Sequence, residues 1–233
     1  MNVADAKGRK WDAATGIGFA VLGIVAFALP GSPPKADDPA SEVGSFFADH
    51  RKEVLIGTFL LGVAAILFLW FAGTLRSYLR SGEGGEGRLS AASFGGGVAG
   101  IALLLVGAAV VNMEAFEFAK QANGTPALAK AVFDASSAFF AVSAMCFGTF
   151  FAAAACSGAR SGALPPWAYW SGSVVAVLQL VAGIALFVES GFFATGGAFP
   201  TFIAPLAAFG WVIGVSVLMM GRDAVPPVPR TEP

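Results

Sequence analysis

Five carboxylates lie at ends of the predicted helices, all near one membrane level, and they are the strongest cluster that could bind a charged ligand. They are Glu53, Glu114, Glu117, Asp134 and Glu189. Carboxylate oxygens are hard ligands, so a convergent set could hold a cation or a basic group. Helix ends also carry carboxylates without any site, because water solvates them and the helix dipole favours them at N-termini. The candidate binding residues from this cluster are Glu114, Glu117, Asp134 and Glu189.

Gln179 is the second candidate, because it is the strongest polar group expected at mid-depth of an apolar segment. It belongs to a series at helical spacing, namely Gly172, Ala176, Gln179 and Gly183. The spacing predicts that Gln179 lies on a face of small residues against a neighbouring helix. Its amide would then hydrogen-bond across that contact, for about 0.5–2 kcal/mol. The alternative is a polar contact inside a substrate cavity.

Residue patterns for catalysis do not occur in the apolar segments. They contain no Ser–His, Cys–His, H-E-x-x-H or paired-aspartate arrangement, and the lone His50 leaves no haem or histidine-based metal site. Cys146 and Cys156 fall in one predicted helix, about 15 Å apart and too far for a disulfide. We therefore expect no enzymatic activity, no cofactor and no metal.

The composition indicates a membrane protein. Of the 233 residues, 56% are hydrophobic and 12% are charged, whereas a soluble domain carries about 25% charged residues. A soluble fold of this size cannot hide so much apolar surface, so lipid is the solvent that fits. The net charge of −1 gives no electrostatic footprint for nucleic acid. The lipid bilayer is the predicted surrounding, and nucleic acid is not a predicted partner.

Six apolar segments are long enough, or nearly so, for the ~20 helical residues that cross a bilayer. They are residues 13–29, 54–75, 91–111, 135–156, 168–188 and 199–220. The predicted fold is all-α, a polytopic transmembrane helix bundle that forms one integral membrane domain over residues 1–233. The bundle is joined by a loop at 31–52, a flexible linker at 81–88 and a tail at 221–233.

The first segment has a second interpretation as a signal peptide, which would leave five spans. Lys7, Arg9 and Lys10 precede the apolar run, and residues 26–28 (Ala-Phe-Ala) mimic a cleavage site. We favour a retained span, because Pro30 lies just past the proposed cut.

Charge asymmetry predicts that both ends of the chain are cytoplasmic. With the N-terminus inside, nine of the 14 basic residues fall in cytoplasmic segments. They are Lys7, Arg9, Lys10, Arg76, Arg80, Arg88, Arg160, Arg222 and Arg230. The 31–52 loop is then external, and Val43, Phe46 and Phe47 share one face of an amphipathic helix within it. We expect this helix to lie on the outer membrane interface.

Glycines at helical spacing predict close contacts between helices, since small residues let backbones approach in lipid. Those selected for helix packing are Gly96, Gly100, Gly107, Gly172 and Gly183. The pattern fits a tight bundle or a homo-oligomer, and the spacing does not choose between them.

Residues 46–80 carry a resemblance to a known group of proteins. They read FFADHRKEVLIGTFLLGVAAILFLWFAGTLRSYLR, with an F-[FY]-x-x-[HN]-R run, a Gly/Leu-rich span and a W-F-x-G-x-L-R exit. This segment resembles uncharacterised small multi-spanning membrane proteins of actinobacteria. The resemblance implies a bacterial plasma membrane, and it brings no activity or functional residues with it.

These observations favour a non-enzymatic structural or regulatory partner in a membrane complex. The alternative is a small permease or ligand-binding membrane protein, with its site near Gln179 or the outer acidic rim. A water-filled cavity that reaches Gln179 would favour the alternative. A close-packed interior with a large exposed apolar patch would favour the partner protein.

Overall fold

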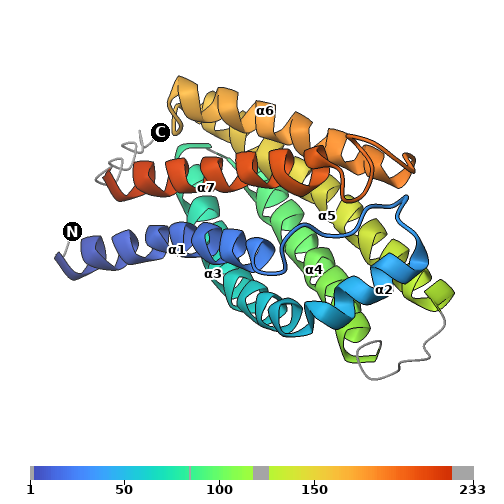
Figure 1. Cartoon of the computed structure of the whole chain (residues 1–233). Helices are drawn as coiled ribbons and strands as arrows, with labels where there is room; N and C mark the ends of the chain where they lie inside the picture. The colour runs from blue at the N-terminus through green and yellow to red at the C-terminus, as the bar shows by residue number, and fades with distance from the viewer. Residues whose placement is uncertain (1–2, 84, 118–125, 222–233) are drawn as a thin grey trace, which may run out of the picture.

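Figure 1 shows the computed structural model, which describes the backbone of residues 3–83, 85–117 and 126–221 and the side chains of 11–83, 85–116 and 127–221. Every regular element in these ranges is helical. In chain order they are α1 (Val3–Ala28), α2 (Ala40–Asp49), α3 (Arg51–Glu83), α4 (Arg88–Glu117), α5 (Pro126–Ser161), α6 (Pro166–Ala182), η1 (Gly183–Leu186), η2 (Phe199–Ile203) and α7 (Ala204–Gly221). Of the short elements, η1 is a 3-10 turn and η2 a π-helical turn. The predicted tail lies outside the described residues from 222 onward.

Six of the described helices are long and apolar enough to cross a membrane. Their apolar stretches are Trp11–Ala28, Arg51–Glu83, Arg88–Phe116, Ala127–Ser161, Pro166–Leu186 and Phe199–Gly221. The predicted all-α bundle of six spans is therefore confirmed, while the orientation with both ends inside stays a prediction. The first stretch is packed into the bundle, with Ala13 and Ala20 buried, while its retention in place of cleavage stays a prediction.

The six long helices form a ring in which each contacts the next in chain order. The contacting pairs are α1–α3, α3–α4, α4–α5, α5–α6, α6–α7 and α7–α1. The first and last helices lie side by side, and α1 begins at the same end of the bundle at which α7 ends (Figure 1). We call this the terminal end. The opposite end, where α2 lies, is the α2 end.

Local signals explain where several helices start and stop. Helix α5 ends before Gly162, whose φ of +67° is the left-handed conformation typical of a helix C-terminus. Helix α6 begins at Pro166, and a proline suits the first turn because its missing N–H would have no partner there. The boundary between α5 and α6 therefore follows from ordinary residue preferences at helix ends.

The linker predicted at 81–88 is shorter in the structure, because residues 81–83 complete α3. The Glu83 carboxylate accepts hydrogen bonds from the backbone N–H groups of Leu89 (2.8 Å) and Ser90 (3.0 Å). These N–H groups belong to the first turn of α4, where no intrahelical acceptor exists. The Ser157 hydroxyl of α5 also donates to Glu83, at 3.3 Å. Glu83 thus ties α3, α4 and α5 together at the terminal end.

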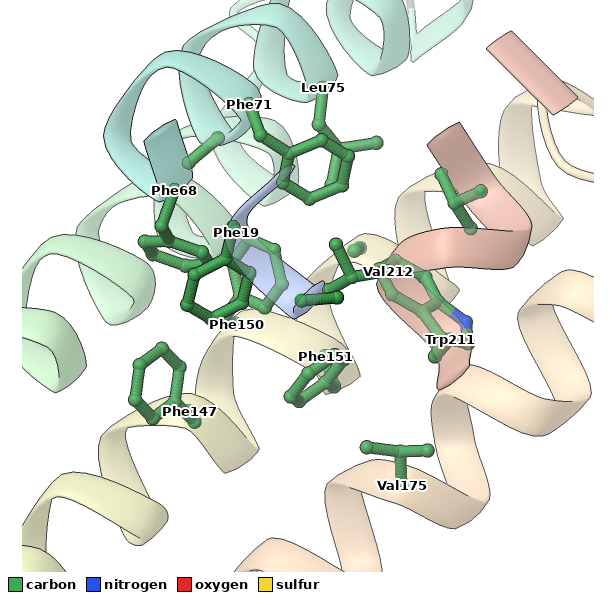
Figure 2. Packing of buried hydrophobic residues seen from close by; sticks show 14 of the residues in the cluster. Phe19, Phe68, Phe71, Leu75, Phe147, Phe150, Phe151, Val175, Trp211 and Val212 are labelled. Carbon is green, nitrogen blue, oxygen red and sulfur yellow. The ribbon is translucent and has the colours of Figure 1, made fainter. Parts of the chain in front are cut away.

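Aromatic side chains fill the ring at mid-depth, and we call this group the aromatic core. It consists of Phe19, Phe68, Phe147, Phe150, Phe151 and Trp211 (Figure 2). The rings meet at tilted or edge-on angles, with centroids 4.9 Å apart for Phe19–Phe68 and 5.2 Å for Phe151–Trp211. Such geometry is favoured between aromatic rings. The core brings α1, α3, α5 and α7 into contact across the ring.

The selected glycines lie at contacts between helices of the same chain. A Cβ added at Gly96 would lie 2.8 Å from the backbone nitrogen of Phe150, and one at Gly100 would lie 3.0 Å from the Phe147 ring. Corresponding close approaches involve Gly107 with Phe140, Gly172 with Trp211, and Gly183 with Met145. These glycines therefore have a packing role inside one bundle, which does not require a second copy.

The helix predicted in the 31–52 loop is α2, but its apolar face has a protein partner. Val43 and Phe47 are buried and pack with Val54, Ala115 and Phe133 from α3, α4 and α5. We expected this face to contact the membrane interface. The structure differs because the ends of three spans supply the apolar surface that α2 covers.

Candidate functional site

A cavity of about 470 Å³ lies inside the helix ring on the side of the α2 end. All seven α-helices contribute to its wall, together with the loops that follow α1 and precede α7. Members of the aromatic core form its floor: Phe19, Phe68, Phe147 and Phe151 line the cavity. The cavity therefore begins where the close packing of the aromatic core ends.

Two loops close the cavity at the α2 end. Pro30, Pro33 and Pro34 line it from the α1–α2 loop, and Thr195 and Gly196 line it from the α6–α7 loop. The two loops are joined by a backbone hydrogen bond from the Ala36 N–H to the Thr195 carbonyl, at 3.0 Å. Gly196 has a φ of +75°, and any side chain there would collide with the Pro34 carbonyl oxygen. Glycine is thus required where the loops meet.

The cavity wall is apolar apart from a few hydroxyl groups and one amide. Three of the lining hydroxyls are already used within the protein: those of Ser136 and Ser137 donate to the Phe133 carbonyl, and that of Ser143 donates to the Gly100 carbonyl. None of the lining residues is charged. A polar ligand would therefore find few partners in this cavity.

Gln179 supplies the amide group of the cavity wall. Both interpretations from the sequence apply to it: it forms a hydrogen bond between two helices, and it contacts a cavity. It is 5% exposed and lines the cavity. Its Nε2 donates to the Ala204 carbonyl oxygen at 3.1 Å, across the contact between α6 and α7. Ala204 lies directly after the π-helical turn η2. Gln179 thus joins α6 to the irregular start of α7 while presenting its side chain to the cavity.

The acidic candidates whose side chains the structure describes do not meet in one site. Glu114 of α4 is fully buried, and neither of its carboxyl oxygens has a hydrogen-bond partner. Asp134 of α5 lies near enough for its charge to act on Glu114, but it is exposed and paired with Lys130. Glu189 is exposed in the α6–α7 loop, and the side chain of Glu117 lies outside the described residues.

Metal binding finds no support in the described part of the chain. It contains no group of three or more His, Cys, Asp or Glu side chains that could hold an ion. Glu53 is half-buried on α3, next to Val54, which packs with Ala115 and Phe133. Glu114 differs from the other described carboxylates in its burial. It faces the protein interior, whereas we expected carboxylates at helix ends to be solvated.

Sequence reasoning identified Gln179 but missed the rest of the cavity. Most of its lining is Ala, Phe, Leu or Val, and such residues look alike in a sequence whether they face a cavity, a neighbouring helix or lipid. Pro200 and Pro205 were the available signal. Prolines disturb the regular helical hydrogen bonds, so two of them in the predicted 199–220 span indicate an irregular start. The structure has η2 at that position.

No protein-family model, curated protein or solved structure matches the chain. The resemblance of residues 46–80 to the actinobacterial membrane proteins therefore stays a prediction. The fold itself defines the class: six long apolar helices are those of a multi-pass membrane protein.

Proposed function

We propose that this membrane protein binds an apolar ligand in the cavity inside its helix ring. One observation carries the proposal: an uncharged, largely apolar cavity of about 470 Å³ reaches Gln179. Ligand pockets typically measure about 300–1,000 Å³ and combine apolar walls with a few polar groups. The size and the lining both fit that pattern.

The chemistry of the wall supports an apolar ligand over a polar one. Water in the cavity gains little, because several lining hydroxyls already donate to backbone carbonyls. An apolar ligand would displace such water without losing strong hydrogen bonds. The permease or ligand-binding alternative from the sequence was tied to a water-filled cavity. The proposed cavity instead holds an apolar ligand.

The packing between the cavity and the terminal end favours ligand binding over transport. The aromatic core occupies the middle of the ring, and Phe68, Phe150 and Phe151 are all under 3% exposed. A solute in the cavity would have to displace these packed rings to reach the terminal end. We therefore prefer a ligand-binding protein to a permease, with no chemical step on the ligand.

The structural or regulatory partner expected from the sequence remains a second candidate. Exposed apolar side chains on α6, such as Trp170, Val174 and Val177, suit either a partner protein or lipid. The cavity is the more specific feature, because a purely structural subunit does not need one. A bacterial plasma membrane, with the α2 end facing outward, stays a prediction.

Photolabelling with an adamantyl diazirine, a small apolar reactive probe, tests the proposal. We expect the probe to label half-buried lining residues such as Ala144 in the detergent-solubilised protein. Ala182 is buried and lines the cavity, so Ala182→Phe should fill the space and reduce that labelling about tenfold, the effect of roughly 1.4 kcal/mol in binding.

Ala152→Phe is the matched control, because Ala152 is exposed on α5 and does not line the cavity. This variant should label like the wild type. Size-exclusion profiles and melting temperatures establish that both variants fold. If Ala144 is unlabelled in the wild type, or equally labelled in folded Ala182→Phe, the cavity is not an apolar binding site.

A further inference from the structure

The exposed part of the cavity lining lies along α1 and α7, which are neighbours in the ring. The lining residues that are exposed all come from α1, the loop directly after it, η2 or α7: they are Ile24, Phe27, Ala28, Gly31, Phe202 and Leu206. Every other lining residue is buried or half-buried. We call this exposed part of the lining the side opening. Its rim side chains line the cavity and reach the outside of the bundle at the same time.

The side opening begins where α1 and α7 stop packing closely. Toward the terminal end the two helices touch: Gly16 contacts Ser216, and a Cβ added at Gly23 would lie 2.7 Å from the Phe209 ring. The next turn of α1 brings Ile24 and Phe27, which are 38% and 42% exposed. Opposite them α7 starts from the π-helical turn, whose extra residue shifts the path of the helix. Phe27 still meets the Phe209 ring, with centroids 6.4 Å apart, so this ring pair borders the side opening.

The residues of the side opening lie within the membrane-spanning stretches, except for Gly31. Ile24 and Phe27 belong to Trp11–Ala28, and Phe202 and Leu206 belong to Phe199–Gly221. All four are apolar, and apolar residues that are exposed within a span face lipid. A ligand that passes between them comes from the bilayer, and a water-soluble ligand would have to leave water first.

We propose that the cavity takes one hydrocarbon chain of a membrane lipid, which enters sideways through the side opening. This inference rests on the proposed function and names its ligand class. The lining has no charged residue, so a charged headgroup would lose its hydration without gaining a partner inside. The chain therefore occupies the cavity while the headgroup stays outside the rim.

A phosphatidylcholine with a diazirine in one acyl chain tests the inference, with the protein in nanodiscs of that lipid. Wild type should form crosslinks at half-buried lining residues such as Ala144, besides those on the lipid-facing surface. Ile24→Trp combined with Leu206→Trp adds bulk on both sides of the rim, where exposed positions tolerate it. We expect the crosslinks inside the cavity to fall about tenfold, the effect of roughly 1.4 kcal/mol.

Val21→Trp combined with Val217→Trp is the matched control. Both residues are exposed on the same two helices, at 50% and 54%, and neither lines the cavity. This variant should crosslink like the wild type. Crosslinks inside the cavity that persist in the rim variant would overturn access through the side opening.

The adamantyl probe separates failure of this inference from failure of the proposed function. If that probe labels the cavity and the lipid chain does not, the cavity binds small apolar solutes, and the lipid-chain inference is wrong. If neither reagent reaches Ala144, the proposed function is wrong as well.

Discussion

Glu114 is the residue most at odds with its surroundings. It is fully buried within an apolar span, and both carboxyl oxygens lack hydrogen-bond partners. Burying a polar group without a partner costs about 1–3 kcal/mol in measured protein variants. Selection for stability alone would place an apolar residue at this position, so Glu114 is a polar group that the packing does not explain.

Replacing Glu114 by Met is therefore expected to stabilise the protein by about 1–3 kcal/mol, because Met has a similar size and no unmet hydrogen bonds. Asp134→Asn is the control, since Asp134 is exposed and its ion pair with Lys130 contributes only about 0–1 kcal/mol. Denaturant unfolding in detergent measures both variants. A loss of stability in Glu114→Met would mean that the carboxyl has a partner that the packing does not reveal.

At the scale of elements, the connection between α3 and α4 depends on one side chain. Glu83→Ala removes the acceptor for the Leu89 and Ser90 N–H groups. By analogy with the loss of a helix N-cap, we expect a destabilisation of about 0.5–2 kcal/mol.

Glu86→Ala gives the comparison for Glu83→Ala in the same loop. Glu86 pairs with Arg88 on the surface, where the two side chains are 75% and 85% exposed. Such a pair contributes about 0–1 kcal/mol, so its loss should change the melting temperature little. Equal effects of the two substitutions would show that the Glu83 cap has no special role.

The contact between α4 and α5 offers a second test at this scale, because adjacent glycines differ in their surroundings. A Cβ at Gly96 would meet the backbone of α5, whereas one at Gly95 would meet nothing within 4 Å. Gly96→Leu should destabilise the bundle by about 1–3 kcal/mol through overpacking. Gly95→Leu should leave the melting temperature in detergent nearly unchanged. Similar melting of both variants would contradict the α4–α5 packing.

The elements could be predicted from the sequence because hydropathy is a local property. The span predicted at 91–111 lies within α4, and that at 135–156 lies within α5, since no charged residue interrupts either run. The partner of α2 could not be predicted, because its apolar face would look the same against lipid or protein. The burial of Glu114 could not be predicted either, because its position near a helix end suggested that water would solvate it.

On the scale of the whole molecule, the ring has two different halves. Beyond the aromatic core at mid-depth, the terminal half is filled by residues such as Leu75 and Val215, which are under 2% exposed. The other half holds the cavity and its side opening. The difference could not be predicted from the spans, since it depends on where facing side chains fill the ring and where they do not. Gln179 was found because an amide is conspicuous in an apolar helix.

Xenon under pressure tests most directly whether this ring encloses an apolar binding cavity. Xenon enters apolar cavities and does not compete for sites held by hydrogen-bonded water. Crystals grown from a lipid mesophase should show anomalous xenon peaks between Phe147, Gln179 and Ala182, and none within the aromatic core. Ordered water throughout that space, without xenon, would contradict the account.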